Sequence, residues 1–191
     1  NYIRGLSFGR FFLNSTMIAL ATVVANALSC LVAAYAFARL RFRLRRVWFA
    51  VMIGTLLLPS HVLIVPQYVM FNSFGWVDTP LPLIVPKLLA TEAFFVFLMV
   101  QFMRGIPREL DEAAMLDGAS RWTIFWKVLL PLTVPAQATL AVFTFLASWN
   151  DYWWPLISAT RSDMYTLTVG LAASQMNYAQ TSGLGFLMAQ A

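Results

Sequence analysis

The chain has 191 residues, of which 60% are hydrophobic and only 11% are charged, and its formal net charge is +5. Soluble domains are about 45–50% apolar and about 25% charged, so this composition excludes an ordinary soluble domain and indicates a membrane protein. The arginines flank apolar runs, where they indicate orientation in a membrane and not a nucleic-acid partner. One cysteine and one histidine exclude an intrachain disulfide and a metal cluster of these residue types.

The first part of the chain predicts an interfacial segment and one membrane span. Residues 1–14 are mixed and Phe-rich, which is typical of a membrane surface, and Asn14 or Ser15 is a candidate cap for the helix that follows. The run 15–38 exceeds the roughly 20 apolar residues that a span requires. Asn26 within it is predicted to make an interhelical hydrogen bond.

The second span is predicted at 47–70, after five arginines between positions 39 and 46. Such a cluster cannot lie in hydrocarbon, and the positive-inside rule makes this loop cytoplasmic. Pro59 and Pro66 predict kinks within the span, because proline lacks a backbone donor. The loop 71–82 contains no Lys or Arg and is predicted to be extracytoplasmic.

Two further spans are predicted at 83–103 and 131–148, and they enclose an inner loop at 104–130 with eight charged residues. Residues 149–181 are expected to form an outer loop, and 183–191 the opening of a further span. The two inner loops then hold nine Lys and Arg residues, against one in the two outer loops. This difference predicts a cytoplasmic 104–130 loop. The chain begins with Asn, and we interpret it as part of a longer one.

The inner loop predicts a short surface helix that ends in a sharp turn. Pro107 suits the first turn of a helix, where its missing N–H does no harm. Asp111 and Glu112 then lie near the positive end of the helix dipole. Gly118 ends this helix, and Ser120 caps a second helix that leads into the next span.

The same loop carries a spaced motif that resembles the EAA loop of binding-protein-dependent ABC importer permeases. The family pattern is Glu-Ala-Ala, three residues, Gly, nine residues, and then Ile-x-Leu-Pro. The single departure here is Val128 in place of Ile. The matching positions in this chain are Glu112, Ala113, Ala114, Gly118, Val128, Leu130 and Pro131.

The resemblance implies that this loop couples the chain to a separate ATPase subunit. In the family, a short helix of the loop sits in a groove of the ATPase and turns closure of the ATPase dimer into movement of membrane helices. Here Glu112 would contact the ATPase, Ala113 and Ala114 would permit close packing, and Gly118 would make the turn. The coupling residues so implied are Glu112, Ala113, Ala114, Asp117, Gly118, Leu130 and Pro131.

Segments along essentially the whole chain, such as LLPSHVLIVPQY and FLASWNDYWWPL, are similar to the maltose-transporter-like second permease of sugar importers. The resemblance implies an all-α, polytopic transmembrane helical bundle with the type I importer permease fold. The family has six spans, of which four complete ones and a partial one are expected here. The expected organisation is one transmembrane domain at 1–191, with the coupling loop at 104–131, in a bacterial inner membrane.

The resemblance also implies partners and a substrate class. The partners would be a second, non-identical permease, two ATPase subunits, an extracytoplasmic substrate-binding protein and membrane lipid. The substrate would be a sugar or sugar-like solute, of the oligosaccharide or glycerol phosphate type, and another small solute stays open. An ion-coupled carrier is a further alternative, although it would not need this loop.

The chain itself is not expected to be an enzyme or to bind a cofactor. A phosphate-binding loop requires Lys followed by Ser or Thr, and neither Lys87 nor Lys127 meets this requirement. ATP and Mg²⁺ would therefore be held by the partner ATPase. No cluster of carboxylates within the spans suggests a catalytic site.

Four polar residues are candidates for lining a substrate path. Glu92 lies within a span, where an ionisable group is costly, and an ion pair with Lys87 is the alternative explanation. Gln137 lies on a polar face of the fourth span, which helix packing explains equally well. Asn150 and Asp151 follow that span among aromatic residues, which are typical of a membrane interface.

Overall fold

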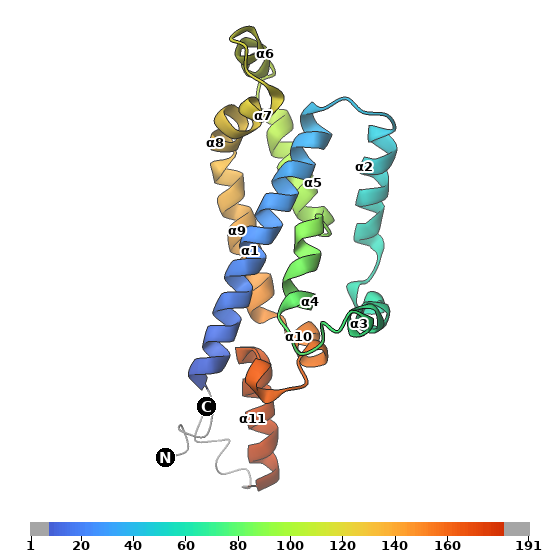
Figure 1. Cartoon of the computed structure of the whole chain (residues 1–191), viewed down its shortest axis with the longest axis vertical. Coiled ribbons are helices and arrows are strands. Elements are labelled where there is room, and N and C mark those ends of the chain that lie inside the picture. The colour runs from blue at the N-terminus through green and yellow to red at the C-terminus, as the bar shows by residue number, and fades with distance from the viewer. Residues whose placement is uncertain (1–7, 182–191) are drawn as a thin grey trace.

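The computed structural model describes residues 8–181, and every element within that range is helical. The elements form an elongated bundle in which α1, α5 and α9 run side by side (Figure 1). In chain order they are α1 (Phe8–Arg39), α2 (Arg45–Gly54), η2 (Thr55–Leu57), η3 (Ser60–Leu63), α3 (Ile64–Ser73), α4 (Leu81–Ile84), η4 (Val85–Leu89), α5 (Ala93–Gly105), α6 (Glu109–Leu116), α7 (Arg121–Ile124), the π-helical turn η5 (Phe125–Leu129), α8 (Leu130–Leu132), α9 (Val134–Asn150), α10 (Trp153–Ser158), η6 (Ser162–Met164) and α11 (Leu167–Thr181).

Helix α1 forms the centre of the bundle, between α5 and α9. Its buried face carries small residues, among them Ala19, Ala34 and Ala38, which let neighbouring helix backbones approach closely. The main core joins this face to α5, to the α7–η5 turn and to α9. Its fully buried members include Cys30, Ala34, Val96, Met99, Val100, Met103, Leu129 and Leu140.

Helix α1 begins at Phe8, so residues 8–14 belong to this helix and the predicted cap at Asn14 or Ser15 is wrong. Both residues lie inside the helix and bind another segment. The Asn14 amide donates to the carbonyl oxygens of Asp163 (2.9 Å) and Tyr165 (3.1 Å). The Ser15 hydroxyl accepts from the backbone N–H of Leu167 at 2.8 Å. Their polar groups serve tertiary contacts, which a sequence pattern does not distinguish from a cap.

Residues 47–70 do not form the single span that the sequence predicts. Helix α2 ends at Gly54, and the backbone becomes extended at Leu58 (φ −80°, ψ 122°) before η3 and α3. Pro59 explains this break, because a proline ring disfavours the helical conformation of the residue before it. Among the described residues, Phe8–Arg39 and Leu81–Gly105 are long and apolar enough to cross a membrane, and a bent pair is the third candidate. Three of the four expected spans thus have helical counterparts by this measure, while the segment 47–70 is interrupted at Leu58.

The bent pair joins Arg121–Leu132 to Val134–Asn150 at an angle of 75°. Thr133 lies at the bend and is fully buried. The predicted fourth span thus consists mainly of α9, while α7, η5 and α8 form an arm that leads away from it. Pro131 and Pro135 flank the bend and cannot donate backbone hydrogen bonds to the preceding turn.

The predicted outer loop at 149–181 is wrong in part, because it contains the helices α10 and α11. Asp78 ties this region to the loop before α4. Its carboxylate accepts from the Thr160 hydroxyl (2.6 Å) and the Arg161 N–H (3.0 Å), and its own N–H donates to Ser158 O (2.9 Å). The hydrogen bonds that the carboxylate accepts, led by that of the Thr160 hydroxyl, lower the pKa of the Asp78 carboxyl. The further span predicted at 183–191 lies outside the described residues.

A buried hydrogen bond between α1 and α9 confirms the interhelical role predicted for Asn26. Its Nδ2 donates to Thr144 Oγ1 at 2.8 Å, and its Oδ1 accepts from Cys30 Sγ at 3.2 Å. Asn26 is fully buried and Thr144 is 4% exposed. The bond therefore joins two helices through a donor and an acceptor that are both buried.

We expect Thr144→Val to destabilise the protein by about 0.5–1.5 kcal/mol, because the buried Asn26 amide loses its acceptor while the side-chain volume hardly changes. Unfolding in detergent micelles, followed by circular dichroism, measures the effect. Thr139→Val on the same helix is the matched control, since Thr139 is exposed and bonds only within α9. Equal effects of the two substitutions would contradict a special role for this hydrogen bond.

Candidate functional site

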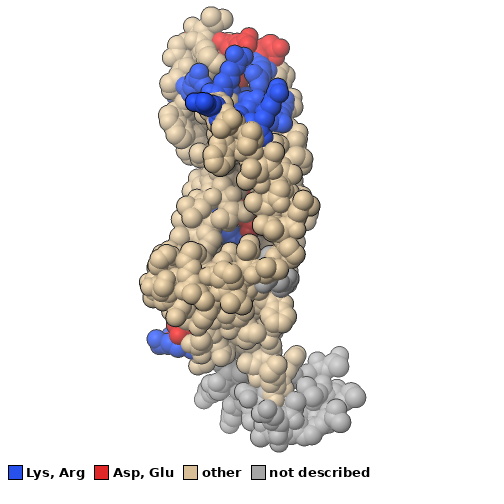
Figure 2. Space-filling model, turned by 90° about the vertical axis from the view of Figure 1, so that its right-hand side faces the viewer, with Lys and Arg blue, Asp and Glu red and all other residues tan. Residues whose placement is uncertain are grey.

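The 104–131 loop lies at one end of the bundle, where α6 projects beyond the other helices (Figure 1). Figure 2 shows that Lys, Arg, Asp and Glu side chains gather at this same end, next to a broad surface with few charges. The predicted short helix is confirmed as α6, whose first turn carries Glu109, Asp111 and Glu112. Negative charge there interacts favourably with the positive end of the helix dipole.

Helix α6 ends in a Schellman turn at Gly118, as the sequence predicts. The N–H of Ala119 donates to Ala114 O (2.9 Å), and the N–H of Gly118 donates to Met115 O (3.0 Å). Gly118 has φ +82°, which glycine adopts without the steric cost that a side chain brings. Ser120 then caps α7 by accepting from the Thr123 N–H at 3.2 Å, again as predicted.

The sequence motif lies on the surface of this loop. Glu112, Ala113 and Asp117 are exposed, while Ala114 is half-buried against the core. Leu116 has 90% of its surface exposed, although it is a large apolar side chain. The sequence patterns did not single out Leu116 as an exposed apolar residue. The feature that could have indicated it is its position directly before the Asp-Gly turn of a charged loop.

Leu130 and Pro131 lie on α8, next to the bend that connects the arm to α9. Gln137 makes hydrogen bonds at this bend. Its Nε2 donates to Leu130 O (2.7 Å) and to Thr133 Oγ1 (2.9 Å). The amide thereby joins Thr133, which also donates to Leu130 O through its N–H and its hydroxyl, in a group of hydrogen bonds across the bend. The structure thus places Gln137 beside the bend, and it does not line the cavity described next.

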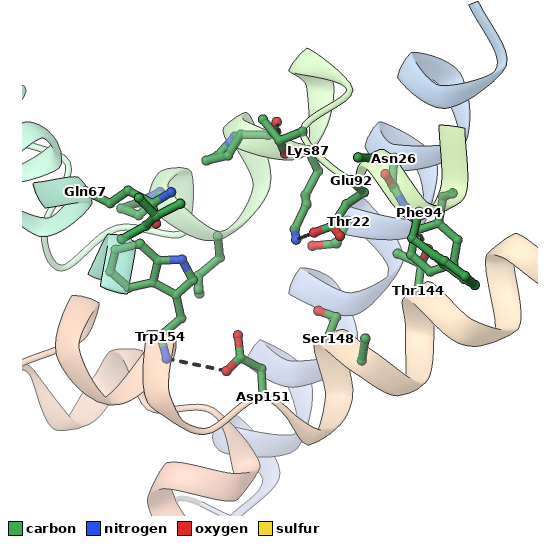
Figure 3. Close-up of a pocket in the computed structure, with 18 of the residues that line it drawn as sticks. Thr22, Asn26, Gln67, Lys87, Glu92, Phe94, Thr144, Ser148, Asp151 and Trp154 are labelled. Atoms are coloured by element: carbon green, nitrogen blue, oxygen red, sulfur yellow. Dashed lines mark hydrogen bonds and ion pairs between the residues drawn. The ribbon is translucent and has the colours of Figure 1, made fainter. Parts of the chain in front are cut away.

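A cavity of about 870 Å³ opens between α1, the α4–η4 turn, α5, α9 and α10. Figure 3 shows Lys87 and Glu92 pointing toward one another on one side of it and Asp151 on another. Lys87 Nζ and Glu92 Oε1 form an ion pair. Asp151 Oδ1 accepts from the Trp154 N–H at 3.4 Å. Glu92 therefore has the partner that the alternative explanation required, and it also lines the cavity.

The remaining surface of the cavity is largely apolar, with hydroxyl, amide and aromatic groups distributed over it. The polar and aromatic side chains that line it include Thr22, Asn26, Gln67, Ser148, Trp153 and Trp154. Thr22 Oγ1 is buried and has no hydrogen-bond partner among residues 8–181. Asn150, by contrast, is exposed, does not line the cavity and donates to Leu146 O at 2.8 Å. Of the four predicted path residues, Glu92 and Asp151 line the cavity, whereas Gln137 and Asn150 do not.

No group of three or more His, Cys, Asp and Glu residues within 8–181 lies close enough together to hold a metal ion.

Residues 25–191 match the family of binding-protein-dependent transport system inner membrane components, and the chain belongs to this family. The resemblance inferred from the loop motif is thereby confirmed.

Three relatives indicate which permeases are similar to this chain. It is 34% identical over 167 residues to the diacetylchitobiose uptake system permease protein NgcG of Streptomyces coelicolor, covering 87% of this chain and 55% of the relative. It is 35% identical over 162 residues to the arabinooligosaccharides transport system permease protein AraQ of Halalkalibacterium halodurans, covering 85% and 57%. It is 35% identical over 164 residues to the sn-glycerol-3-phosphate transport system permease protein UgpE of Yersinia pestis, covering 86% and 58%. The chain therefore spans little more than half of these relatives.

The fold is similar to that of a chain in the crystal structure of a bacterial ABC transporter involved in the import of the acidic polysaccharide alginate. The TM-score is 0.79 at 24% identity, and the match covers 95% of this chain and 63% of that chain. This similarity confirms the all-α membrane-protein fold.

We expect Gly118→Ala to loosen the end of α6, because a residue with a side chain at φ +82° is strained by about 1–2 kcal/mol. Hydrogen–deuterium exchange of a peptide covering 109–120 measures this change, and we expect severalfold faster exchange. Gly105→Ala is the matched control. An added Cβ meets nothing within 4 Å at either position, but Gly105 lies in a regular helix. Equal exchange in the two variants would contradict the assigned turn.

Proposed function

We propose that the chain is the core of a permease subunit of an ATP-driven importer, in which α6 is the coupling helix that a separate ATPase engages. The observation that carries the proposal is the exposed α6 and its Schellman turn, with the family motif on the surface at Glu112, Ala113 and Gly118. Membership of the binding-protein-dependent family supports the same function. A self-sufficient ion-coupled carrier, the alternative, leaves this exposed loop without a purpose.

The proposed assembly contains a second, non-identical permease, two ATPase subunits and an extracytoplasmic substrate-binding protein, all in or at a bacterial inner membrane in contact with lipid. ATP and Mg²⁺ belong to the ATPases, and this chain contributes no catalytic group. The charged end with α6 faces the cytoplasm in this proposal. The five arginines between positions 39 and 46 support that orientation, because basic loops remain on the cytoplasmic side.

In the proposed mechanism, ATP binding closes the ATPase dimer and displaces α6. The arm of α7, η5 and α8 carries this displacement to the bend at Thr133 and so to α9, which lines the cavity. The cavity then opens outward to receive the solute from the binding protein, and hydrolysis returns it to the inward-facing state. Movement of a rigid element around a bend is a common way to convert a local event into domain motion.

We propose an uncharged saccharide as the solute. The named relatives transport diacetylchitobiose, arabinooligosaccharides or sn-glycerol-3-phosphate. Among the described residues that line the cavity, the cation is Lys87, and Glu92 neutralises it, while Asp151 adds negative charge. Such a lining disfavours a phosphate ester, whereas Trp153, Trp154 and the hydroxyl groups fit a sugar. Another small neutral solute is the alternative.

The test of the coupling role is the ATPase activity and uptake of the reconstituted complex, with and without binding protein. We expect Glu112→Lys to reduce both the stimulated ATPase activity and the uptake at least tenfold, because a positive charge replaces the carboxylate that meets the ATPase. Ser162→Lys introduces a charge on an exposed residue far along the chain and serves as the control. Uptake that persists without any ATPase subunit would instead establish a carrier.

The test of the substrate class uses the cavity ion pair. We expect Glu92→Gln to make sugar phosphates several times better competitors of uptake, because Lys87 is then left without its counter-charge. Competition assays in proteoliposomes measure this shift. A second variant that combines Glu92→Gln with Lys87→Met removes both charges, so sugar phosphates should compete no better than in the wild type. Equal competition in both variants would argue against an electrostatic filter at this pair.

A further inference from the structure

The last turn of α1 contacts α6 through a buried ion pair. Arg39 is the final residue of α1, and its Nε lies 3.3 Å from Asp111 Oδ2. The two side chains are only 4% and 11% exposed. Arg39 Nη2 also donates to Ile106 O at 2.8 Å. Asp111 thus differs from Glu109 and Glu112 of the same helix, which are exposed.

Two further contacts connect the same turn of α1 to the loop on either side of α6. Arg108 Nη2 donates to Ala38 O at 3.4 Å, just before α6. The Tyr35 hydroxyl donates to Arg121 O at 2.9 Å, just after the Gly118 turn. The end of α1 therefore contacts the loop before α6, within α6 and after α6.

The electrostatic environment of Asp111 makes the pair sensitive to the loss of either partner. Burial raises the pKa of the Asp111 carboxyl, and the nearby Arg39 and Arg108 oppose this shift. A buried charge whose partner is removed is strongly destabilised, so the pair can hold α6 firmly in one place. The contact is an ion pair by distance and not a hydrogen bond, since Arg39 Nε and Asp111 Oδ1 both lack a hydrogen-bond partner among residues 8–181.

Helix α1 continues without a break from this contact to the opposite part of the molecule. It has 32 residues, or about 48 Å at 1.5 Å per residue, and contains no proline. Thr22 and Asn26 of α1 line the cavity, and Asn14 and Ser15 bind the segment before α11. The route from α6 through α8 to α9, by contrast, passes the 75° bend at Thr133.

We propose that Arg39 and Asp111 are positioning residues that attach α6 to α1, so that α1 carries the displacement of α6 directly to the cavity. This inference rests on the proposed function, since it assigns a second route to the same coupling helix. It predicts that breaking the pair separates ATP hydrolysis from transport, and does not merely weaken the fold.

The experiment measures the solute transported per ATP hydrolysed in the reconstituted complex with its binding protein. We expect Asp111→Asn to retain ATPase subunits on co-purification and to hydrolyse ATP, but to lower the transport ratio at least fivefold. The exchanged pair, Arg39→Asp with Asp111→Arg, should recover part of the ratio. Asp163→Asn is the control, because it breaks the more exposed ion pair with Arg161, which lies away from α6, and it should leave the ratio unchanged.

A wild-type ratio in Asp111→Asn would overturn the inference while leaving the proposed function intact. An absence of ATP-dependent uptake in the wild type would overturn both. If Asp111→Asn does not assemble, Tyr35→Phe decides, because it removes only the hydroxyl that bonds Arg121 O. About a twofold lower ratio in Tyr35→Phe would support transmission through α1, and an unchanged ratio would show that these contacts only maintain the fold.

Discussion

The close packing of α1 against α5 and α9 is the interaction on which the rest of the described structure depends. In a membrane the hydrophobic effect does not drive helices together, so contact area and interhelical hydrogen bonds must do so. Small residues such as Ala34 and Ala38 allow the backbones to approach, and Met99 and Leu140 fill the remaining space. Because α1 is held on two sides, its end is fixed relative to the loop at 104–131.

The interruptions of helical structure have a common physical cause and different consequences. At Leu58 the chain leaves the helix because Pro59 follows, and α2 and α3 become separate elements. At Thr133 the chain bends by 75° between Pro131 and Pro135, and the Gln137 amide adds hydrogen bonds to Leu130 O and Thr133 Oγ1 across the bend. Breaks of this kind are tolerated at membrane depth only where protein or a cavity covers them. Leu58 borders the polar cavity, as this rule requires.

The polar groups inside the bundle divide into pairs that hold the structure and groups that face the cavity. Asn26 and Thr144 satisfy one another across two helices, although both also border the cavity. Lys87 and Glu92 neutralise one another, which lowers the cost of two charges in an apolar region. Thr22 has a buried hydroxyl without a partner in the described part of the chain, so it is available to water or a solute. The same cavity therefore combines stability with the ability to bind polar molecules.

The sequence by itself determined the features that depend on local backbone chemistry. It predicted helix α6, its end at Gly118 and the cap at Ser120, because helix ends have few solutions and each requires particular residue types. It also predicted the family, since the motif fixes residue identity and spacing together. The membrane spans were predicted from the length of apolar segments. This criterion failed at Pro59, where the predicted continuous helix is interrupted.

Only the tertiary structure decided which residues meet across the chain. Asp111 and Arg39 are 72 positions apart, and Asn14 binds carbonyl groups about 150 positions away. No local pattern distinguishes Asp111, which is buried, from its exposed neighbours, because burial depends on where α1 ends. Gln137 and Asp151 are both polar residues near the same predicted span. For the same reason, the sequence did not show that Gln137 contacts the bend while Asp151 lines the cavity. A helix pattern specifies a face, and only packing decides what that face contacts.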